Sequence, residues 1–198
     1  MLGSTDFWNE GIDGNYNSAL ALRQPASVFK PFVFTAAFLQ GRLPGYPNGI
    51  TAATMTYDVE MEFDNGGQPY TPVNIDRQYH GPVSVRSALA NSYNVPPVQL
   101  ASTIGLGPIV RVAHRLGINS LNETDRYGLA LALGSAEVSL LDITYAYNVF
   151  NTGGYMVGMP VRANQAAPGF RTLNPVALLR IEAPDGTVLW EYGQETGT

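Results

Sequence analysis

Two prolines and a glycine fix one buried helix near the start of the chain. Pro25 and Pro31 flank Ser27, and Gly41 follows a run of apolar residues. Proline lacks an N–H group, so Pro31 is tolerated only in the first turn of a helix. The run after Pro31 is apolar almost all round, which is typical of a helix buried on every side. We therefore expect a core helix that starts at or near Ser27 and stops before Gly41.

Ser27 and Lys30 stand three residues apart at the tip of this expected helix. Residues i and i+3 are neighbours on one helix face, so the hydroxyl and the amine could meet. A neutral lysine can activate a serine as a nucleophile, and burial near a helix N-terminus favours the neutral form. The same spacing also fits a helix cap followed by a solvated lysine. Lys30 is the only lysine of the chain, which favours a specific role.

A second polar cluster, Ser92-Tyr93-Asn94, precedes Pro96 and Pro97. A loop between two helices can present small polar side chains to a cleft. Ser92 could carry a proton between Lys30 and a leaving nitrogen, and Asn94 offers both a donor and an acceptor to an amide. Taken alone, these residues are more typical of an ordinary turn with local side-chain hydrogen bonds.

Composition limits the possible partners and cofactors. The 198 residues carry a net charge of −5 with no basic run, which argues against nucleic acid and against an anionic lipid surface as partners. The chain has no cysteine, and His80 and His114 are far apart in sequence, so no zinc-binding set is expected. No apolar run reaches the roughly 18 residues of a membrane-spanning helix, and no targeting segment is visible.

The periodicity of the chain predicts a mostly helical α+β fold. Residues 57–64 alternate as a half-buried strand, with the apolar residues inward and the acidic ones on a solvated outer face. Residues 68–83 are expected to be irregular. Further helices are predicted from Ser84 to Ala90, over about 98–104, over about 108–116, and from Ser139 to about 151; a hairpin is predicted over 176–183 and 187–192.

Four segments together resemble class A penicillin-binding proteins, the bifunctional glycosyltransferase/transpeptidase enzymes of peptidoglycan synthesis. They are residues 23–32 (RQPASVFKPF), 81–96 (GPVSVRSALANSYNVP), 113–118 (AHRLGI) and 131–139 (LALGSAEVS). The order of the segments is that of the family, and they are spread across most of the chain. Ser-x-x-K with partner motifs is a signature of penicillin-binding proteins and of serine β-lactamases. The resemblance implies a transpeptidase fold similar to that of the serine β-lactamases.

The resemblance implies a role for each matched residue. Ser27 is expected to attack the D-Ala-D-Ala peptide bond of a stem peptide, with Lys30 as general base. Ser92 is expected to transfer protons, and Asn94 to bind the substrate amide. β-Lactam antibiotics are expected to acylate the same serine, and the resemblance implies no metal and no cofactor. Glu137 is interpreted as a buried structural carboxylate rather than a catalytic acid.

The chain also departs from the family pattern. The third family motif, Lys-Thr-Gly, is absent, and Glu195-Thr196-Gly197-Thr198 is not accepted as its equivalent. We therefore interpret residues 1–198 as a single piece of a transpeptidase domain. It lacks much of the central sheet, the Lys-Thr-Gly strand, the glycosyltransferase domain and the membrane anchor. The isolated piece is expected to be impaired or inactive.

Two other functions remain open from the sequence. One is a non-catalytic structural or binding module of the same fold, and the other is a serine β-lactamase. The resemblance favours the transpeptidase, which would act on the extracytoplasmic side of the bacterial cell membrane and contact the membrane only through the absent anchor. The sequence leaves the oligomeric state unknown.

Overall fold

The computed structural model describes residues 4–122, 126–176 and 178–192. The α-helices are α1 (Lys30–Phe38), α2 (Val85–Ala90), α3 (Val95–Ile104), α4 (Leu106–Leu116) and α5 (Leu140–Asn151). Short 3-10 helices are η1 (Glu10–Ile12), η2 (Ala26–Phe29) and η4 (Leu129–Leu133). The strands are β1 (Leu22–Arg23), β2 (Met55–Asp58), β3 (Phe63–Asp64), β4 (Pro69–Tyr70), β5 (Gly81–Ser84), β6 (Val138–Ser139), β7 (Met159–Pro160), β8 (Leu173–Asn174), β9 (Arg180–Glu182) and β10 (Val188–Glu191).

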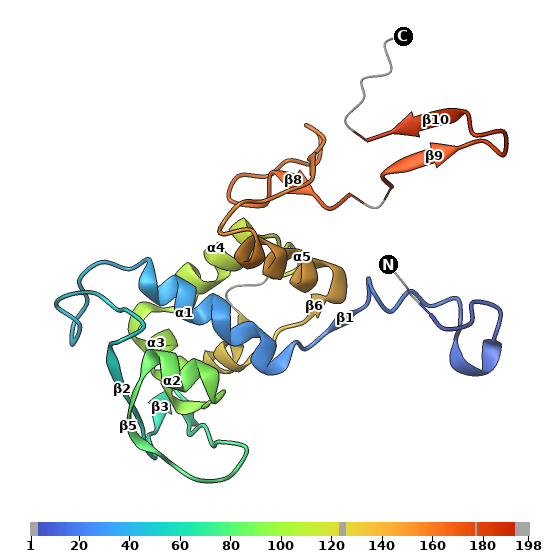
Figure 1. Cartoon of the computed structure of the whole chain (residues 1–198). Coiled ribbons are helices and arrows are strands. Elements are labelled where there is room, and N and C mark those ends of the chain that lie inside the picture. The colour runs from blue at the N-terminus through green and yellow to red at the C-terminus, as the bar shows by residue number, and fades with distance from the viewer. Residues whose placement is uncertain (1–3, 123–125, 177, 193–198) are drawn as a thin grey trace.

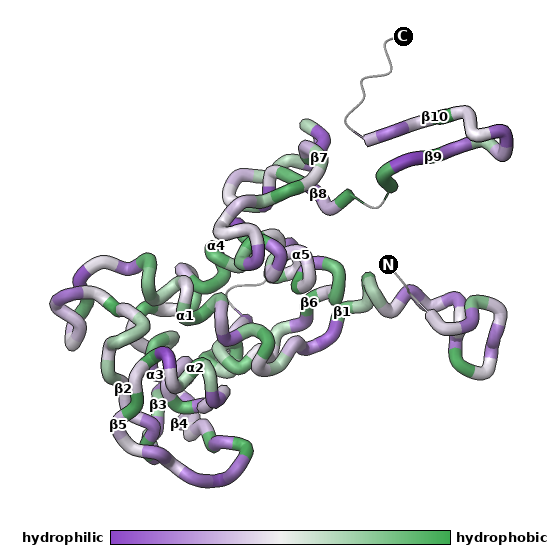
Figure 2. The backbone as a smooth tube through the Cα atoms, viewed as in Figure 1, coloured by the Kyte–Doolittle hydropathy of each residue, from purple (hydrophilic) through white to green (hydrophobic). Residues whose placement is uncertain are grey.

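Helix α1 forms the centre of the core. It packs against α3 and α4, and Phe32 also contacts the rings of Tyr147 and Phe150 on α5. Phe32, Val33 and most of their neighbours on α1 are fully buried, as its apolar sequence predicts. Figure 1 shows α1 running through the middle of the helices, and Figure 2 shows hydrophobic residues among the helices and a mixture of hydrophilic and hydrophobic residues along the β9–β10 hairpin.

The described strands pair only in twos, all antiparallel: β1 with β6, β2 with β5, β3 with β4, β7 with β8, and β9 with β10. The prediction of a mostly helical α+β chain with little of a central sheet is confirmed. Antiparallel pairing of β1 with β6 sets Leu22 opposite Ser139, so the chain after β1 runs back along residues 134–138 and η2 contacts η4. Among the described helices, none is long and apolar enough to cross a bilayer.

Local signals predicted most helix ends correctly. The Ser84 hydroxyl accepts a hydrogen bond from the N–H of Ser87, and Ser139 accepts one from Asp142, so both serines cap their helices. Gly117 ends α4 as expected. Helix α3 begins at Val95 rather than near residue 98, because Pro96 and Pro97 lie in its first turn, where no N–H is needed.

The predicted strand over 57–64 is wrong. Only Met55–Asp58 and Phe63–Asp64 are strands, and they belong to different sheets. In β2 the alternation is reversed, because Tyr57 is 51% exposed and Asp58 is completely buried. Asp58 can be buried because several hydrogen-bond donors surround its carboxylate. Residues 81–84, expected to be irregular or to precede a helix, form β5 against β2.

Two segments project from the helical core. Residues 4–21 lead away from α1 toward the N-terminus, and the β9–β10 hairpin stands apart from the helices beyond β8 (Figure 1). The core cluster of buried apolar residues extends from Phe29 to Ala146 and contains no member of either segment. The core therefore coincides with the part of the chain that carries Ser27, Lys30, Ser92 and Asn94.

Candidate functional site

Ser27 lies in a single 3-10 turn, η2, which runs directly into α1 at Lys30. The N–H of Lys30 donates to the carbonyl oxygen of Ser27. In a 3-10 turn, residues i and i+3 eclipse, so the Ser27 and Lys30 side chains leave the backbone on the same side. The expected helical start near Ser27 is confirmed, although the α-helix itself begins at Lys30.

Two contacts hold the turn that carries Ser27. Ala26 has a φ of 49°, an uncommon conformation for a residue with a side chain, and its N–H donates to the Gly134 carbonyl. A Cβ added at Gly134 would lie 2.1 Å from the Ala26 carbonyl oxygen, so only glycine fits there. On the other side, the Tyr147 hydroxyl of α5 donates to the Val28 carbonyl at 2.8 Å.

The Lys30 amine is buried among three oxygen atoms. Nζ lies 2.5 Å from the Ser92 carbonyl oxygen, 3.0 Å from Ser92 Oγ and 2.7 Å from Asn94 Oδ1. The side chain is 1% exposed, and burial lowers the Lys30 pKa from 10.5 to about 8. A neutral amine could donate to the carbonyl and the amide oxygen while its lone pair faces a hydroxyl. The site therefore favours an amine that can accept a proton near neutral pH.

Ser92 and Asn94 lie in the turn between α2 and α3. Ser92 has a φ of 57°, and the turn is held by bonds from the Ser92 N–H to Leu89 and from the Tyr93 N–H to Ala88. The Asn94 amide nitrogen Nδ2 donates to the Val73 carbonyl at 2.6 Å. These bonds set both oxygen atoms of Ser92 toward Lys30.

The structure thus brings Lys30, Ser92 and Asn94 into direct contact. Ser27 is next to this group along the chain and is partly exposed. Within the described residues, its hydroxyl makes no side-chain hydrogen bond, so it is free to turn toward a bound molecule or toward Lys30. Hydrogen bonds between catalytic groups often form fully only when substrate is bound.

Several residues around the site were not foreseen from the sequence. Tyr147 and Gly134 support the Ser27 turn, while Asp58 and Asn74 lie beneath the Ser92–Asn94 turn. Gly134 belongs to a segment that resembles the family, but its contact with Ala26 has no local sequence signal. The interpretation of Glu137 as a buried carboxylate is wrong, because its side chain is exposed beside a surface hollow.

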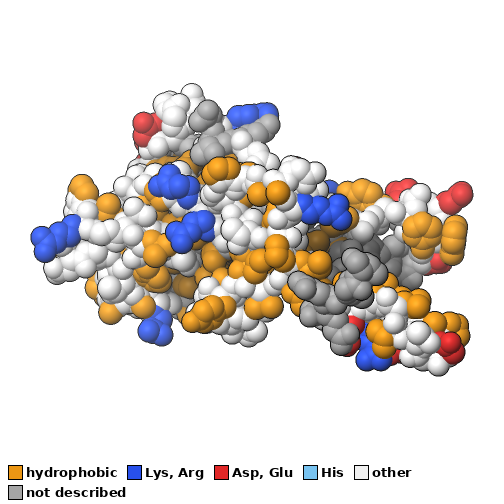
Figure 3. All heavy atoms as spheres, turned by 90° about the horizontal axis from the view of Figure 1, so that it is seen from above, with side chains coloured by type: hydrophobic (Ala, Val, Ile, Leu, Met, Phe, Trp, Pro, Cys, Tyr) orange, Lys and Arg blue, Asp and Glu red, His pale blue; other side chains and the backbone are white. Residues whose placement is uncertain are grey.

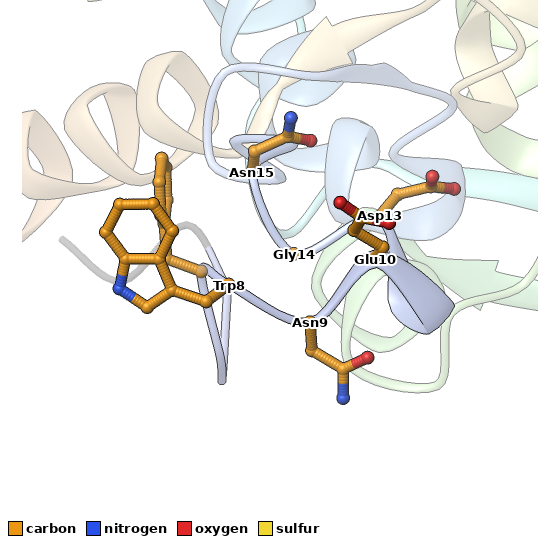
Figure 4. Close-up of a pocket in the computed structure, with 7 residues that line it drawn as sticks. Trp8, Asn9, Glu10, Asp13, Gly14 and Asn15 are labelled. Carbon is orange, nitrogen blue, oxygen red and sulfur yellow. The ribbon is translucent and has the colours of Figure 1, made fainter.

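Hollows elsewhere on the surface do not contain these groups. One of about 410 Å³ is formed by residues of the projecting N-terminal segment, including Trp8, Glu10 and Asp13 (Figure 4). Trp8 is 86% exposed there. On the face seen in Figure 3, basic side chains are scattered singly among apolar and uncharged ones. Within the described residues, no group of three or more His, Asp or Glu side chains could hold a metal ion. The residues 195–198 lie outside the described part.

Comparison with protein families gives one match over most of the chain. Residues 9–162 match the family described as the penicillin binding protein transpeptidase domain. Penicillin-binding protein 1A of Neisseria cinerea is 34% identical over 164 residues, which cover 81% of this chain and 19% of the relative. Penicillin-binding protein 1A of Pseudomonas aeruginosa is 32% identical over 180 residues, covering 89% of this chain and 19% of the relative. The chain spans about a fifth of the length of these curated relatives.

Solved structures agree on the fold. The crystal structure of Penicillin-Binding Protein 1A from Haemophilus influenzae aligns with a TM-score of 0.69 and 26% identity, over 90% of this chain and 23% of that chain. The PonA1 protein from Mycobacterium tuberculosis, in complex with penicillin V, aligns with a TM-score of 0.65 and 21% identity, over 89% of this chain and 43% of that chain. The second likeness concerns the fold alone, and the first confirms the fold that the sequence segments predict.

Proposed function

Because this chain belongs to the penicillin-binding protein transpeptidase domain family, we propose that Ser27 is the nucleophile of a serine acyl transfer that cross-links peptidoglycan. The substrates are D-Ala-D-Ala stem peptides, and β-lactams acylate the same serine. Residues 1–198 belong to one transpeptidase domain. The reaction takes place on the extracytoplasmic side of the bacterial cell membrane.

The observation that carries the proposal is the environment of Lys30. A lysine with a pKa of about 8 is partly neutral at physiological pH, and a neutral amine can remove a proton from a serine hydroxyl. Lys30 is held 3.0 Å from Ser92 Oγ, and Ser92 offers a route by which the proton can move on. A solvated lysine serving only as a surface residue would have no reason to be buried among three oxygen atoms.

The proposed acyl transfer has two steps. In the first, Lys30 takes the Ser27 proton while Oγ bonds to the carbonyl carbon of the D-Ala-D-Ala peptide bond. The C–N bond then breaks, and the proton passes through Ser92 to the departing amine of the terminal D-Ala. In the second step, an amine of a neighbouring stem peptide attacks the ester and releases Ser27 with its proton restored. Asn94 binds the substrate amide.

The test is intact-mass spectrometry of the longest natural form of the protein that contains this chain, after incubation with a labelled penicillin. We expect one covalent adduct that is lost in Ser27→Ala and retained in Ser102→Ala, a control at an exposed serine of α3. A long-lived adduct fits a transpeptidase, whereas rapid hydrolysis would indicate a β-lactamase. Absence of the adduct, or its persistence in Ser27→Ala, would refute the proposal. We expect the 198-residue chain alone to react more slowly.

A further inference from the structure

A buried polar network lies beneath the turn that contains Ser92 and Asn94. Its centre is Asp58 on β2, whose side chain is completely buried, and Asn74, which is 5% exposed. An ionised carboxylate inside a protein is costly unless donors surround it. The donors around Asp58 therefore indicate what the carboxylate holds in place.

The first arm of the network runs from Asp58 to Asn94. Asn74 Nδ2 lies 2.9 Å and 2.8 Å from the two carboxylate oxygens of Asp58, and 2.7 Å from the Gln78 carbonyl oxygen. With its amide nitrogen fixed in this way, Asn74 turns its own oxygen outward. That oxygen accepts a hydrogen bond from the Asn94 N–H at 2.7 Å. Asn94 in turn touches Lys30 through Oδ1.

The second arm runs from Asp58 to Tyr93. The N–H of His80 donates to Asp58 Oδ2 at 3.0 Å, and His80 Nδ1 lies 2.7 Å from the same oxygen. The other ring nitrogen of His80 lies 3.2 Å from Asp76 Oδ2. The imidazole stacks on the Tyr93 ring, with 4.1 Å between the ring centroids and 14° between the planes. Asp58 therefore reaches two successive residues of the turn.

We propose that Asp58 and Asn74 are positioning residues that hold the Ser92–Asn94 turn against the Lys30 amine. Asp58 accepts from both arms and donates to neither, so the amide of Asn74 has one orientation and presents its oxygen to Asn94. The turn needs this support because Ser92 adopts a left-handed backbone conformation that a serine rarely occupies. The consequence for catalysis rests on the proposed function, whereas the positioning of Lys30 does not.

The single lysine makes the proposal directly measurable. A 198-residue chain labelled with ¹³C-lysine gives one lysine signal, whose titration by NMR reports the surroundings of Lys30 alone. Burial lowers the Lys30 pKa. Loosening the turn should admit water to the amine and so raise this pKa. We expect Asp58→Asn and Asn74→Ala, neither of which adds a negative charge near the amine, each to move the Lys30 pKa from about 8 toward 10.5. Circular dichroism at each pH checks that the variants remain folded.

A rescue and a control separate positioning from general loss of stability. The conservative variant Asp58→Glu keeps a carboxylate facing the Asn74 amide and the His80 N–H, so its Lys30 pKa should lie closer to 8 than that of Asp58→Asn. Asp64→Asn removes an exposed carboxylate on β3 that, among the described residues, is bonded only to the Gly67 N–H, and it should leave the titration unchanged. His80→Ala removes the imidazole of the second arm, keeps the backbone N–H bond to Asp58, and serves where the buried variants unfold. An unchanged Lys30 pKa in every folded variant of the network would overturn the proposal.

Penicillin acylation of the longest natural form of the protein gives a separate readout. Misplacement of a catalytic group by about 1 Å can cost about 100-fold in rate, and we expect a loss approaching that size in Asp58→Asn and a smaller loss in Asp58→Glu. A shifted Lys30 pKa in a protein that penicillin never acylates would support the positioning network and refute the proposed function. Normal acylation of the Asp58→Asn variant by penicillin, together with an unshifted Lys30 pKa, would support the proposed function and refute the positioning network.

Discussion

Within the described residues, the buried Lys30 amine is bonded to neutral oxygen atoms and to no carboxylate. Its three partners are the carbonyl and hydroxyl oxygens of Ser92 and the amide oxygen of Asn94. A buried carboxylate partner would have stabilised the ammonium and raised its pKa. The choice of neutral partners therefore keeps the amine available as a base, which is the property that the proposed chemistry requires.

The low pKa of Lys30 has a consequence for stability. The pKa is about 8 in the folded chain and near 10.5 in the unfolded one, so between these pH values the unfolded state binds more protons. Stability then rises with pH across this window. Relative to Lys30→Met, we expect the wild-type free energy of unfolding to increase by about 2 kcal/mol from pH 8 to pH 10.5, after allowing for solvent screening. Urea unfolding of both proteins at several pH values measures this increase. A difference in the free energy of unfolding that does not change with pH would contradict the prediction.

Gly134 is expected to be essential for the turn that carries Ser27. It has a φ of 77°, and an added Cβ would meet backbone atoms of Ala26 at 2.1 and 2.6 Å. We expect Gly134→Ala to lower the free energy of unfolding by about 3 kcal/mol, because strain and a backbone clash combine. Gly153→Ala is the matched control: φ is 70° but nothing lies within 4 Å of the added Cβ, so a loss of about 1 kcal/mol is expected. Equal losses in denaturant unfolding would show that the contact with Ala26 is unimportant.

At the scale of elements, local sequence signals predicted the helices but not the contacts between residues that are far apart in the sequence. The caps at Ser84 and Ser139 and the stop at Gly117 depend on residues within a few positions of one another, so the sequence displays them. The strand over 57–64 failed because Asp58 is buried by partners 16 and 22 residues away. A prediction from periodicity places every carboxylate on the solvent face, because it takes no account of hydrogen-bond partners that are distant in sequence.

The same distinction applies to the candidate site. Ser27 and Lys30 were predictable as a pair because one helical turn joins them, and Ser92 and Asn94 because the four segments resemble a known family. Their supports come from far away: Asn74 is 20 residues from Asn94, and Tyr147 is 119 residues from Val28. Only the folded chain reveals these contacts.

Two tyrosines on α5 allow the support of Ser27 to be tested. The Tyr147 hydroxyl donates to the Val28 carbonyl, whereas the Tyr145 hydroxyl donates to the Val157 and Leu173 carbonyls. The Tyr147→Phe variant loses the bond to Val28, which should destabilise the productive position of Ser27 by about 1 kcal/mol. We therefore expect penicillin to acylate this variant about fivefold more slowly.

Tyr145→Phe is the control for this prediction, since it removes comparable hydrogen bonds from the same helix. It should lower the melting temperature while leaving the acylation rate of the folded protein unchanged. Equal slowing in both variants would mean that α5 acts through overall stability and that Tyr147 has no particular influence on Ser27.

Over the whole molecule, stability is concentrated in the helical core between Phe29 and Ala146. The N-terminal segment and the β9–β10 hairpin project from it, and both expose apolar side chains such as Trp8 and Leu189. Segments that bury little apolar surface open at low free-energy cost, whereas core helices open only with global unfolding. The candidate site is therefore built on the most stable part of the chain.

Limited digestion with chymotrypsin tests this distribution of stability. We expect the first cuts at exposed aromatic residues outside the core, namely Trp8, Tyr16 and Tyr155, which are 86%, 49% and 75% exposed. Tyr57 is 51% exposed, but it lies in β2, whose pairing with β5 protects its backbone from the protease. The fragment that persists should contain Phe29–Ala146 intact, as shown by its mass. Phe34 is 1% exposed and should be cut only as fast as the chain unfolds globally. In the purified fragment, the single lysine should titrate as in the whole chain, since every oxygen around its amine belongs to the core. Early cleavage within α1, or a lysine pKa that returns to 10.5 once the projecting segments are removed, would show that these segments also stabilise the site.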